Sequence, residues 1–229
     1  MEAQLPLRIV ATSIVFRRLD QTAFVPDYVN IHHRDETIIG VGDAWLLGRF
    51  AFGDDQLRGV VRAGLTVPLG STVPDPFALA DQGKEHQHAQ IGTGVVQPIV
   101  GLAGFKSVGG WRVRGHVMAI LGLYPNTDSY QPGHRGLIGA AGDTALGPAR
   151  ISMGADVSQE TPETWGGANH HEGNLGRTDV LLNVGVNWPL GDRWRGGLTI
   201  RVPVVQRVNE DAVTYPAILE FRVDGDIGN

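Results

Sequence analysis

The sequence predicts an all-β protein, an antiparallel up-and-down transmembrane β-barrel of about ten strands. Three observations predict this fold. Apolar and polar residues alternate along segments of about 9 to 14 residues, close to the length of a tilted membrane strand. Charged residues, mostly arginines, recur in the middle of these segments. Short and long connections follow one another along the chain.

The alternation is clearest in residues 56–69 and 111–124. In the second segment Val113 and Val117 point one way, and Arg112, Arg114 and His116 point the other. A soluble sandwich would have to bury one of these faces in a core, and buried unpaired charges are very costly. A membrane barrel places the apolar face against lipid and the polar face around its lumen.

The first five expected strands each separate an apolar from a polar face. In the first, Leu7 and Ile9 oppose Arg8, and in the second Phe50 and Phe52 oppose Arg49. The fourth is glycine-rich and less regular. The five strands are expected at residues 5–18, 37–52, 56–69, 89–105 and 111–124.

The last five expected strands continue the pattern. The segment at residues 136–146 alternates weakly. In the final segment Leu219 and Phe221 oppose Glu220 and Arg222. These strands are expected at residues 136–146, 149–158, 175–190, 197–205 and 215–223.

The connections predict the up-and-down order. Short turns rich in Gly, Asp and Pro are expected at residues 53–55, 106–110, 147–148 and 191–193. Longer connections are expected at residues 20–33, 70–88, 125–135, 158–174 and 207–212. Membrane barrels have short periplasmic turns and longer outer loops, so we expect the short turns to face the periplasm.

Composition narrows the function classes. The 229 residues carry a net charge of −5 without a basic stripe, so we expect no nucleic-acid partner. The chain has no cysteine, which excludes disulfides and thiolate metal sites. No apolar run approaches the roughly 18 residues that a spanning helix needs.

We expect one domain over residues 1–229. The first residues lack the charged and apolar regions of a secretory signal, which an outer-membrane protein needs. Two interpretations stay open: either the numbering begins at a mature or trimmed end, or the membrane assignment is wrong. If a strand or hairpin is missing upstream, the complete barrel has about twelve strands.

The predicted lumen is rich in arginine. A surplus of guanidinium groups predicts a positive field that favours anions, and the alternative is a set of Arg–carboxylate pairs that hold the strands together. The expected lumen residues are Arg8, Asp43, Arg49, Arg58, Arg62, Arg112, Arg114, His116, Arg150, Asp156, Arg177, Asp179, Arg201, Glu220 and Arg222.

Seven of the eight histidines fall in or beside the longer connections. If those connections share one rim, the imidazoles share it too, and a site for a divalent transition metal becomes a hypothesis. The alternative is that they are ordinary polar loop residues. The candidate ligands are His32, His33, His86, His88, His134, His170 and His171.

Three stretches carry a resemblance to known proteins. They are His-His-Arg-Asp-Glu-Thr at 32–37 leading into Gly-Val-Gly-Asp at 40–43, Gly-Leu-Thr-Val-Pro-Leu-Gly at 64–70, and Gly-Thr-Gly at 92–94 followed by Gln-Pro at 97–98. The chain resembles Gram-negative outer-membrane β-barrels described as meta-pathway phenol-degradation proteins or transporters. The resemblance implies a signal peptide and an outer-membrane location, and it brings no catalytic residues.

We therefore expect a non-enzymatic outer-membrane barrel for the passage or binding of small solutes, with the lipid bilayer as its surroundings. No Gly-x-Ser-x-Gly sequence or phosphate-binding glycine loop occurs. Two alternatives stay open, a surface barrel that binds metal through its histidine rim and a soluble β-barrel binding protein.

Overall fold

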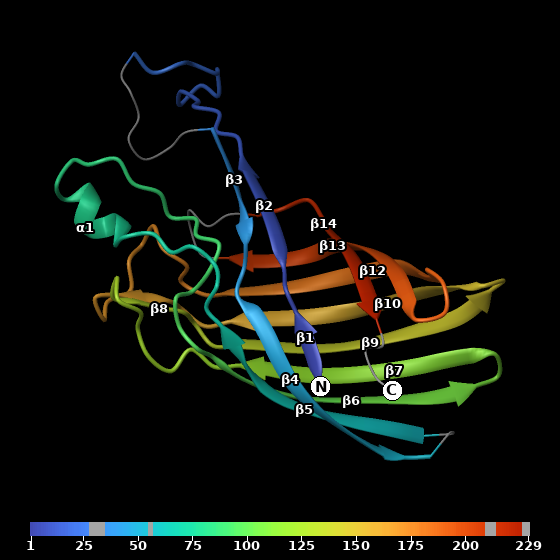
Figure 1. The fold of residues 1–229 in the computed structure, drawn as a ribbon. Helices are drawn as coiled ribbons and strands as arrows, with labels where there is room; N and C mark the ends of the chain where they lie inside the picture. The colour runs from blue at the N-terminus through green and yellow to red at the C-terminus, as the bar shows by residue number, and fades with distance from the viewer. Residues whose placement is uncertain (28–34, 55–56, 209–213, 226–229) are drawn as a thin grey trace.

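The computed structural model describes residues 1–27, 35–54, 57–208 and 214–225 (Figure 1). It is all-β, and its main feature is one curled antiparallel sheet that forms a half-barrel. The sheet consists, in spatial order, of β1 (Glu2–Gln4), β4 (Ala44–Gly53), β5 (Leu57–Val67), β6 (Pro98–Val108), β7 (Trp111–Ile120), β9 (Arg135–Leu146), β10 (Ala149–Glu160), β12 (Arg177–Pro189), β13 (Trp194–Val208) and β14 (Ile218–Gly225).

From β4 onward, each strand of the sheet pairs with the next one along the chain. All of these pairs are antiparallel, so the predicted up-and-down order is confirmed. Glycines with positive φ occur at the short turns, among them Gly53 (φ 92°) and Gly191 (φ 94°), where a side chain would be strained. The long connections at residues 68–97, 121–134 and 161–176 leave the opposite rim of the sheet, where these loops gather beyond the strand ends (Figure 1).

The first two predicted strands are each divided in two. β2 (Leu7–Thr12) and β3 (Glu36–Val41) form their own antiparallel pair, which projects beyond the rim of the sheet (Figure 1). The division falls at Pro6, which has no N–H to donate, and at Gly42 and Asp43 opposite it. Residues 13–18 are not a strand, so the expected strand at 5–18 is too long.

The barrel is open, and this corrects the expectation of a closed one. In the described chain β1 and β14 are the two outer strands of the sheet and do not pair with each other. β1 covers only three residues of β4, Trp45 to Leu47, before the chain turns outward into β2. In the described chain, β1 therefore leaves residues 48–53 of β4 without a partner on that edge.

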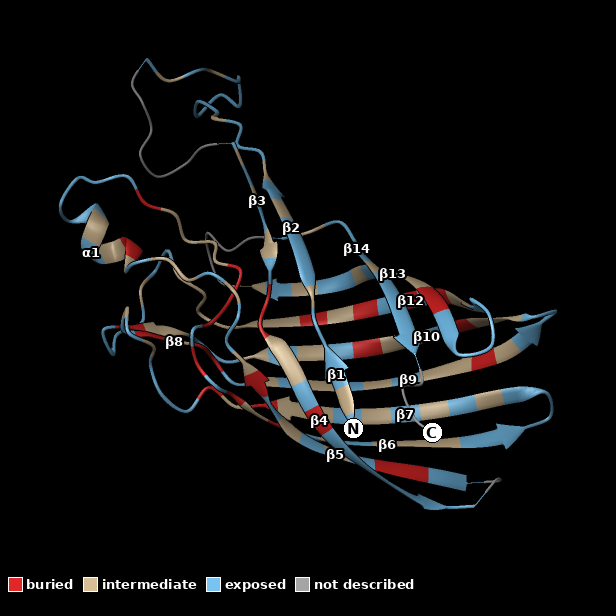
Figure 2. Cartoon of the chain, in the orientation of Figure 1, coloured by how far each residue is buried: buried red, intermediate tan, exposed pale blue. Residues whose placement is uncertain are grey.

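Burial is reversed relative to a soluble protein. Large apolar side chains on one face are exposed, with Phe50 at 69% and Val184 at 64%, and the same holds along every long strand (Figure 2). On the opposite face Asp156 and Asp179 are buried, at 5% and 3%. The apolar set of the predicted alternation therefore lies on one face and is exposed. The polar set lies on the opposite face, where the carboxylates of Asp143, Asp156 and Asp179 are buried and Arg49, Arg58 and Arg222 are exposed.

A small apolar core lies on the polar face near the long-loop rim. Leu47, Ile99 and Ile120 are buried there, and Trp45 and Met118 pack against them. This cluster is small because most apolar side chains of the sheet point the other way. No helix of the described residues is long and apolar enough to cross a membrane.

Three connections fold over this core, and we name residues 68–97, 121–134 and 161–176 together the cap. The cap contains the only helix among the described residues, α1 (Pro76–Ala80), and the short pair β8 (Tyr130–Gln131) and β11 (Thr164–Trp165). Residues 89–97 belong to the cap, because the strand expected from residue 89 begins only at Pro98. Residues 121–124 likewise follow the end of β7.

Candidate functional site

The polar face carries ion pairs that connect neighbouring strands. Asp143 on β9 lies between Arg112 on β7, whose Nε is 3.0 Å from Oδ1, and Arg150 on β10, whose Nε donates to Oδ2. Asp143 is 1% exposed. A carboxylate held by two guanidinium groups makes charge-assisted hydrogen bonds, which are stronger than neutral ones.

A second cluster surrounds Asp156 on β10. Asn183 Nδ2 donates to its Oδ2 at 3.0 Å, His116 Nε2 lies 3.4 Å from Oδ1, and Arg201 Nη1 lies 3.5 Å from Oδ2. Arg201 also donates to Glu220 at 2.8 Å. His116 on β7 and Arg201 on β13 are each two strands away from β10, so the side chains converge over the sheet. This convergence is what the concave face of a curled sheet produces.

Further pairs lie toward the two edges of the sheet. Glu2 on β1 lies 3.5 Å from Arg49 and 3.3 Å from Arg62. Arg177 donates to Asp179 at 2.8 Å near the other edge. Arg58 lies over the ring of Phe105, and Arg222 pairs with the exposed Asp224 at 2.9 Å.

Most expected lumen residues are therefore brought together on one face. Arg8 and Asp43 lie instead near the rim, where the cap meets the sheet. Sequence reasoning missed Glu2 and Asp143. Asn183 lies on the polar face of the predicted 175–190 strand but was not among the expected lumen residues. The signal for Asp143 was weak because its strand is mostly Gly and Ala, and its position directly opposite Arg112 follows only from the register.

Asp43 attaches the cap to the sheet. Its Oδ1 accepts from the Gly70 N–H at 3.0 Å, and its Oδ2 accepts from the N–H and hydroxyl of Thr93 at 2.8 and 2.7 Å. Asn126 donates to the carbonyl of Thr93 at 3.1 Å and so joins the second cap loop to the first. Three charge-assisted bonds to one buried carboxylate hold this junction together.

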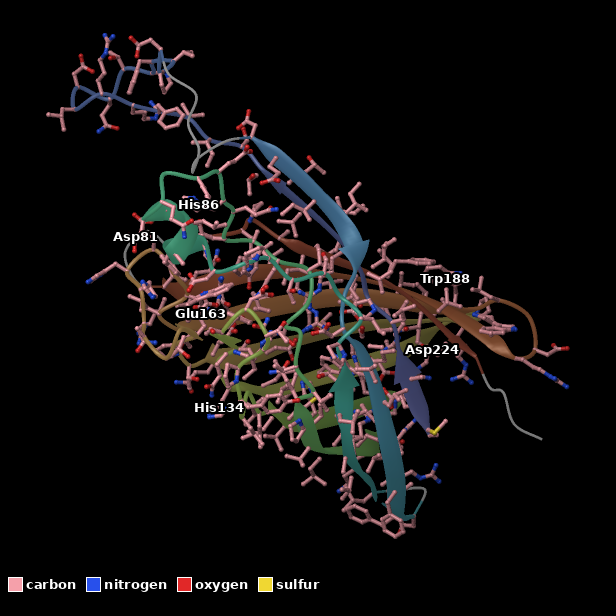
Figure 3. The ribbon with its side chains drawn as sticks, turned by 60° about the vertical axis from the view of Figure 1, so that its left-hand side comes forward. Asp81, His86, His134, Glu163, Trp188 and Asp224 are labelled. Atoms are coloured by element: carbon pink, nitrogen blue, oxygen red, sulfur yellow. The ribbon has the colours of Figure 1, made fainter. Side chains whose placement is uncertain are left out.

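Aromatic contacts hold the outer part of the cap, near the labelled His86 (Figure 3). His170 stacks on Phe77 with ring centroids 3.9 Å apart, and His88 meets the same ring edge-on at 5.1 Å. His86 lies edge-on to His88 at 5.4 Å. The structure thus brings together three of the predicted histidines, from two loops.

The other predicted metal ligands do not join them. His134 lies well away from His86 (Figure 3), and its Nδ1 accepts from the Gly122 N–H at 3.2 Å. His171 is exposed, and His32 and His33 fall outside the described residues. Within the ranges that the structure describes, no group of three or more His, Asp or Glu could hold a metal ion. Metal binding stays a prediction.

Glu163 lies inside the cap (Figure 3). Its Oε1 accepts from the Asn174 N–H at 3.1 Å and from the indole N–H of Trp165 at 3.2 Å. Burial nevertheless raises the pKa of Glu163 above the usual glutamate value, because removal from water disfavours the carboxylate. Burial likewise raises the pKa of the neighbouring Tyr130.

A polar cavity of about 80 Å³ lies between the cap and the sheet. Arg8 and Arg135 line it from the strands, and Gln90 and Gln97 line it from the cap. Trp45 contributes an apolar wall. By the measure of one probe sphere per water, this space holds several waters or one small solute.

Comparison with known proteins assigns no family. No protein-family model matches the chain, and no curated protein matches it. The resemblance to outer-membrane barrels described above therefore stays a prediction. The case for a function depends on the polar face and the cavity.

Proposed function

We propose that this chain forms the wall of an outer-membrane β-barrel whose polar inner face serves the passage or binding of small solutes, without enzymatic activity. The observation that carries the proposal is the reversed burial of the sheet, with apolar side chains outside and charged side chains inside. In water, an apolar outer face of this extent would favour aggregation. Against lipid the same face would be stabilising.

The charge balance of the inner face supports a role with solutes. Arginines outnumber the carboxylates that pair with them, and Arg114 makes no ion pair to a described residue. Guanidinium groups keep their charge at any working pH, so the inner face favours anions. Strand length is also sufficient, because the strands of the main sheet from β4 to β13 have 10 to 15 residues and a tilted membrane strand needs roughly 9 to 11.

The proposal requires that both edges of the sheet be paired inside the membrane. An unpaired backbone N–H or C=O in hydrocarbon costs several kcal/mol, so an open edge cannot face lipid. The edge strands β1 and β14 must therefore pair with each other or with further strands.

Single-cysteine labelling tests the membrane placement, since the chain has no cysteine of its own. Val117→Cys carries a fluorophore on the outer face of β7, and Arg114→Cys carries it on the inner face of the same strand. In phospholipid vesicles, brominated lipid should quench the fluorophore at position 117 and aqueous iodide should not. The reverse is expected at position 114.

Two outcomes contradict the proposal. Quenching of position 117 by iodide alone would show that the outer face is in water, as in a soluble barrel. Passage is tested separately by conductance in planar bilayers, with the reversal potential measured under a salt gradient. If no current steps appear at any voltage, passage of ions is excluded. If the reversal potential shows that cations pass more readily than anions, the predicted preference of the arginine-rich lumen for anions is wrong.

A further inference from the structure

Two residues that line the cavity beneath the cap each have a buried hydrogen-bond donor without a partner among the described residues. Gln97 is 2% exposed, and its Nε2 has no hydrogen-bond partner among the described residues. Arg135 Nε is also buried without a hydrogen bond to them, since Glu160 Oε1, at 3.4 Å, forms only a long ion pair. Both unsatisfied groups are donors. A buried donor without a partner is unfavourable, so a ligand that accepts a hydrogen bond from it gains binding free energy.

The carboxylate in the cavity lining already has hydrogen-bond partners. Asp43 is the only carboxylate that lines the cavity within the described chain, and both of its oxygens accept bonds from Gly70 and Thr93. A cation entering the cavity would meet an occupied carboxylate and two guanidinium groups, those of Arg8 and Arg135. The cavity therefore favours a ligand that accepts hydrogen bonds and disfavours a cation.

We propose that this cavity binds a small monocarboxylate anion. The guanidinium groups of Arg8 and Arg135 and the amide N–H of Gln97 would hold the carboxylate, because planar guanidinium forks match its geometry. Trp45, Ile91 and Ile120 supply an apolar wall for a short carbon chain. The volume of about 80 Å³ limits the ligand to a few carbons beyond the carboxylate.

The cavity lies at the rim of the polar face, where a solute would enter or leave. Only its place on a route through the barrel rests on the function proposed above. Binding can be measured on the full chain in detergent whether or not current flows. If the quenching pattern places the outer face in lipid but no anion binds, only this inference is refuted. If an anion binds but the quenching pattern places the outer face in water, only the barrel proposal is refuted.

Calorimetry on the full chain tests the proposal with sodium propanoate as the probe. Saturable binding is expected, and propanamide, a neutral compound of similar shape, should bind at least tenfold more weakly. Gln97→Glu places a carboxylate in the cavity and should weaken propanoate binding by tenfold or more. Arg8→Gln should weaken propanoate binding about tenfold. Because this substitution alters an exposed side chain, the variant can be tested even if Gln97→Glu fails to fold.

Arg18→Gln is the matched control, because this exposed arginine lies outside the cavity. It should leave propanoate binding unchanged. Equal binding of propanoate and propanamide, equal weakening by Arg8→Gln and Arg18→Gln, or no saturable heat would each overturn the proposal. Tighter binding of inorganic phosphate than of propanoate would overturn the assignment to carboxylates.

Discussion

The carboxylate of Asp143 combines near-complete burial with two charged partners. Arg112 and Arg150 reach it from the two adjacent strands, and both are about 40% exposed. The carboxylate thus links three strands, and its loss leaves two neighbouring cations facing each other. Hydrogen bonds to charged groups contribute about 1.5 to 3 kcal/mol each.

We predict that Asp143→Asn lowers the free energy of unfolding by about 1 to 3 kcal/mol. The matched control is Asp224→Asn, because Asp224 pairs with Arg222 where both side chains are 54% exposed. Exposed pairs contribute about 0 to 1 kcal/mol, so the control should change little. Equilibrium unfolding in urea with phospholipid vesicles measures both. Equal effects of the two substitutions would show that Asp143 is not a structural link.

We expect the stability of the cap to depend on pH through Glu163. Its pKa is raised in the folded chain, so the folded state holds the proton more tightly than the unfolded state. Its contribution to stability is then fully present below the ordinary glutamate pKa. It is lost as pH rises from that value through the raised pKa of the folded chain.

We predict that the packing around Trp165 loosens as pH rises through this window. Glu163→Gln should remove the dependence, because glutamine stays neutral and still offers an oxygen to the Trp165 indole. Fluorine NMR of 5-fluorotryptophan protein follows the Trp165 signal. Glu172→Gln, an exposed position in the same loop, should keep the wild-type pH dependence. A pH-independent signal in the unmutated chain would disprove the coupling.

At Gly64 on β5, the backbone of β4 occupies the space where a side chain would begin. A Cβ built there would overlap the carbonyl oxygen of Leu46 on β4. At Gly104 on β6 a Cβ would lie 3.8 Å from its nearest neighbour, the carbonyl oxygen of Arg58, which is an ordinary contact. Any residue with a Cβ at position 64 would therefore push β4 and β5 apart, and glycine avoids this overlap.

We predict that Gly64→Ala destabilises the sheet by about 1 to 3 kcal/mol, the usual cost of overpacking. Gly104→Ala should change the free energy of unfolding by less than about 0.5 kcal/mol. The same urea titrations compare the two variants. A neutral Gly64→Ala would mean that the strands separate at little cost.

Element boundaries were predicted well along most of the sheet, and the strength of the alternation did not decide how well. The weakly alternating segment 136–146 matches β9 to within one residue, while the strongly alternating segment 111–124 extends four residues beyond the end of β7. Residues 56–69 and 149–158 match β5 and β10 to within two residues at each end. The errors occur near the rim. There residues 89–97 look like strand but instead belong to the cap, and Thr93 among them donates to Asp43. Alternation reports which side chains are apolar, but it cannot report where a backbone stops pairing.

At the scale of the whole molecule, the sheet has two open edges and an apolar outer face. Both features are unfavourable in water, because free edges and large apolar patches favour association. If the sheet closes within lipid, its edges are paired and its apolar face contacts hydrocarbon. The membrane proposal therefore explains two properties of the molecule that would otherwise oppose its stability.

The order of the strands and the side that each residue faces were determined by the sequence alone. A two-residue period assigns every side chain of a strand to one face, and this needs no partner. The pairing of Asp143 with two arginines, the attachment of Asp43 to Thr93, 50 residues away, and the cavity of unpaired donors were decided only by the tertiary structure. These contacts join segments far apart in the chain, and no local pattern determines which distant groups meet.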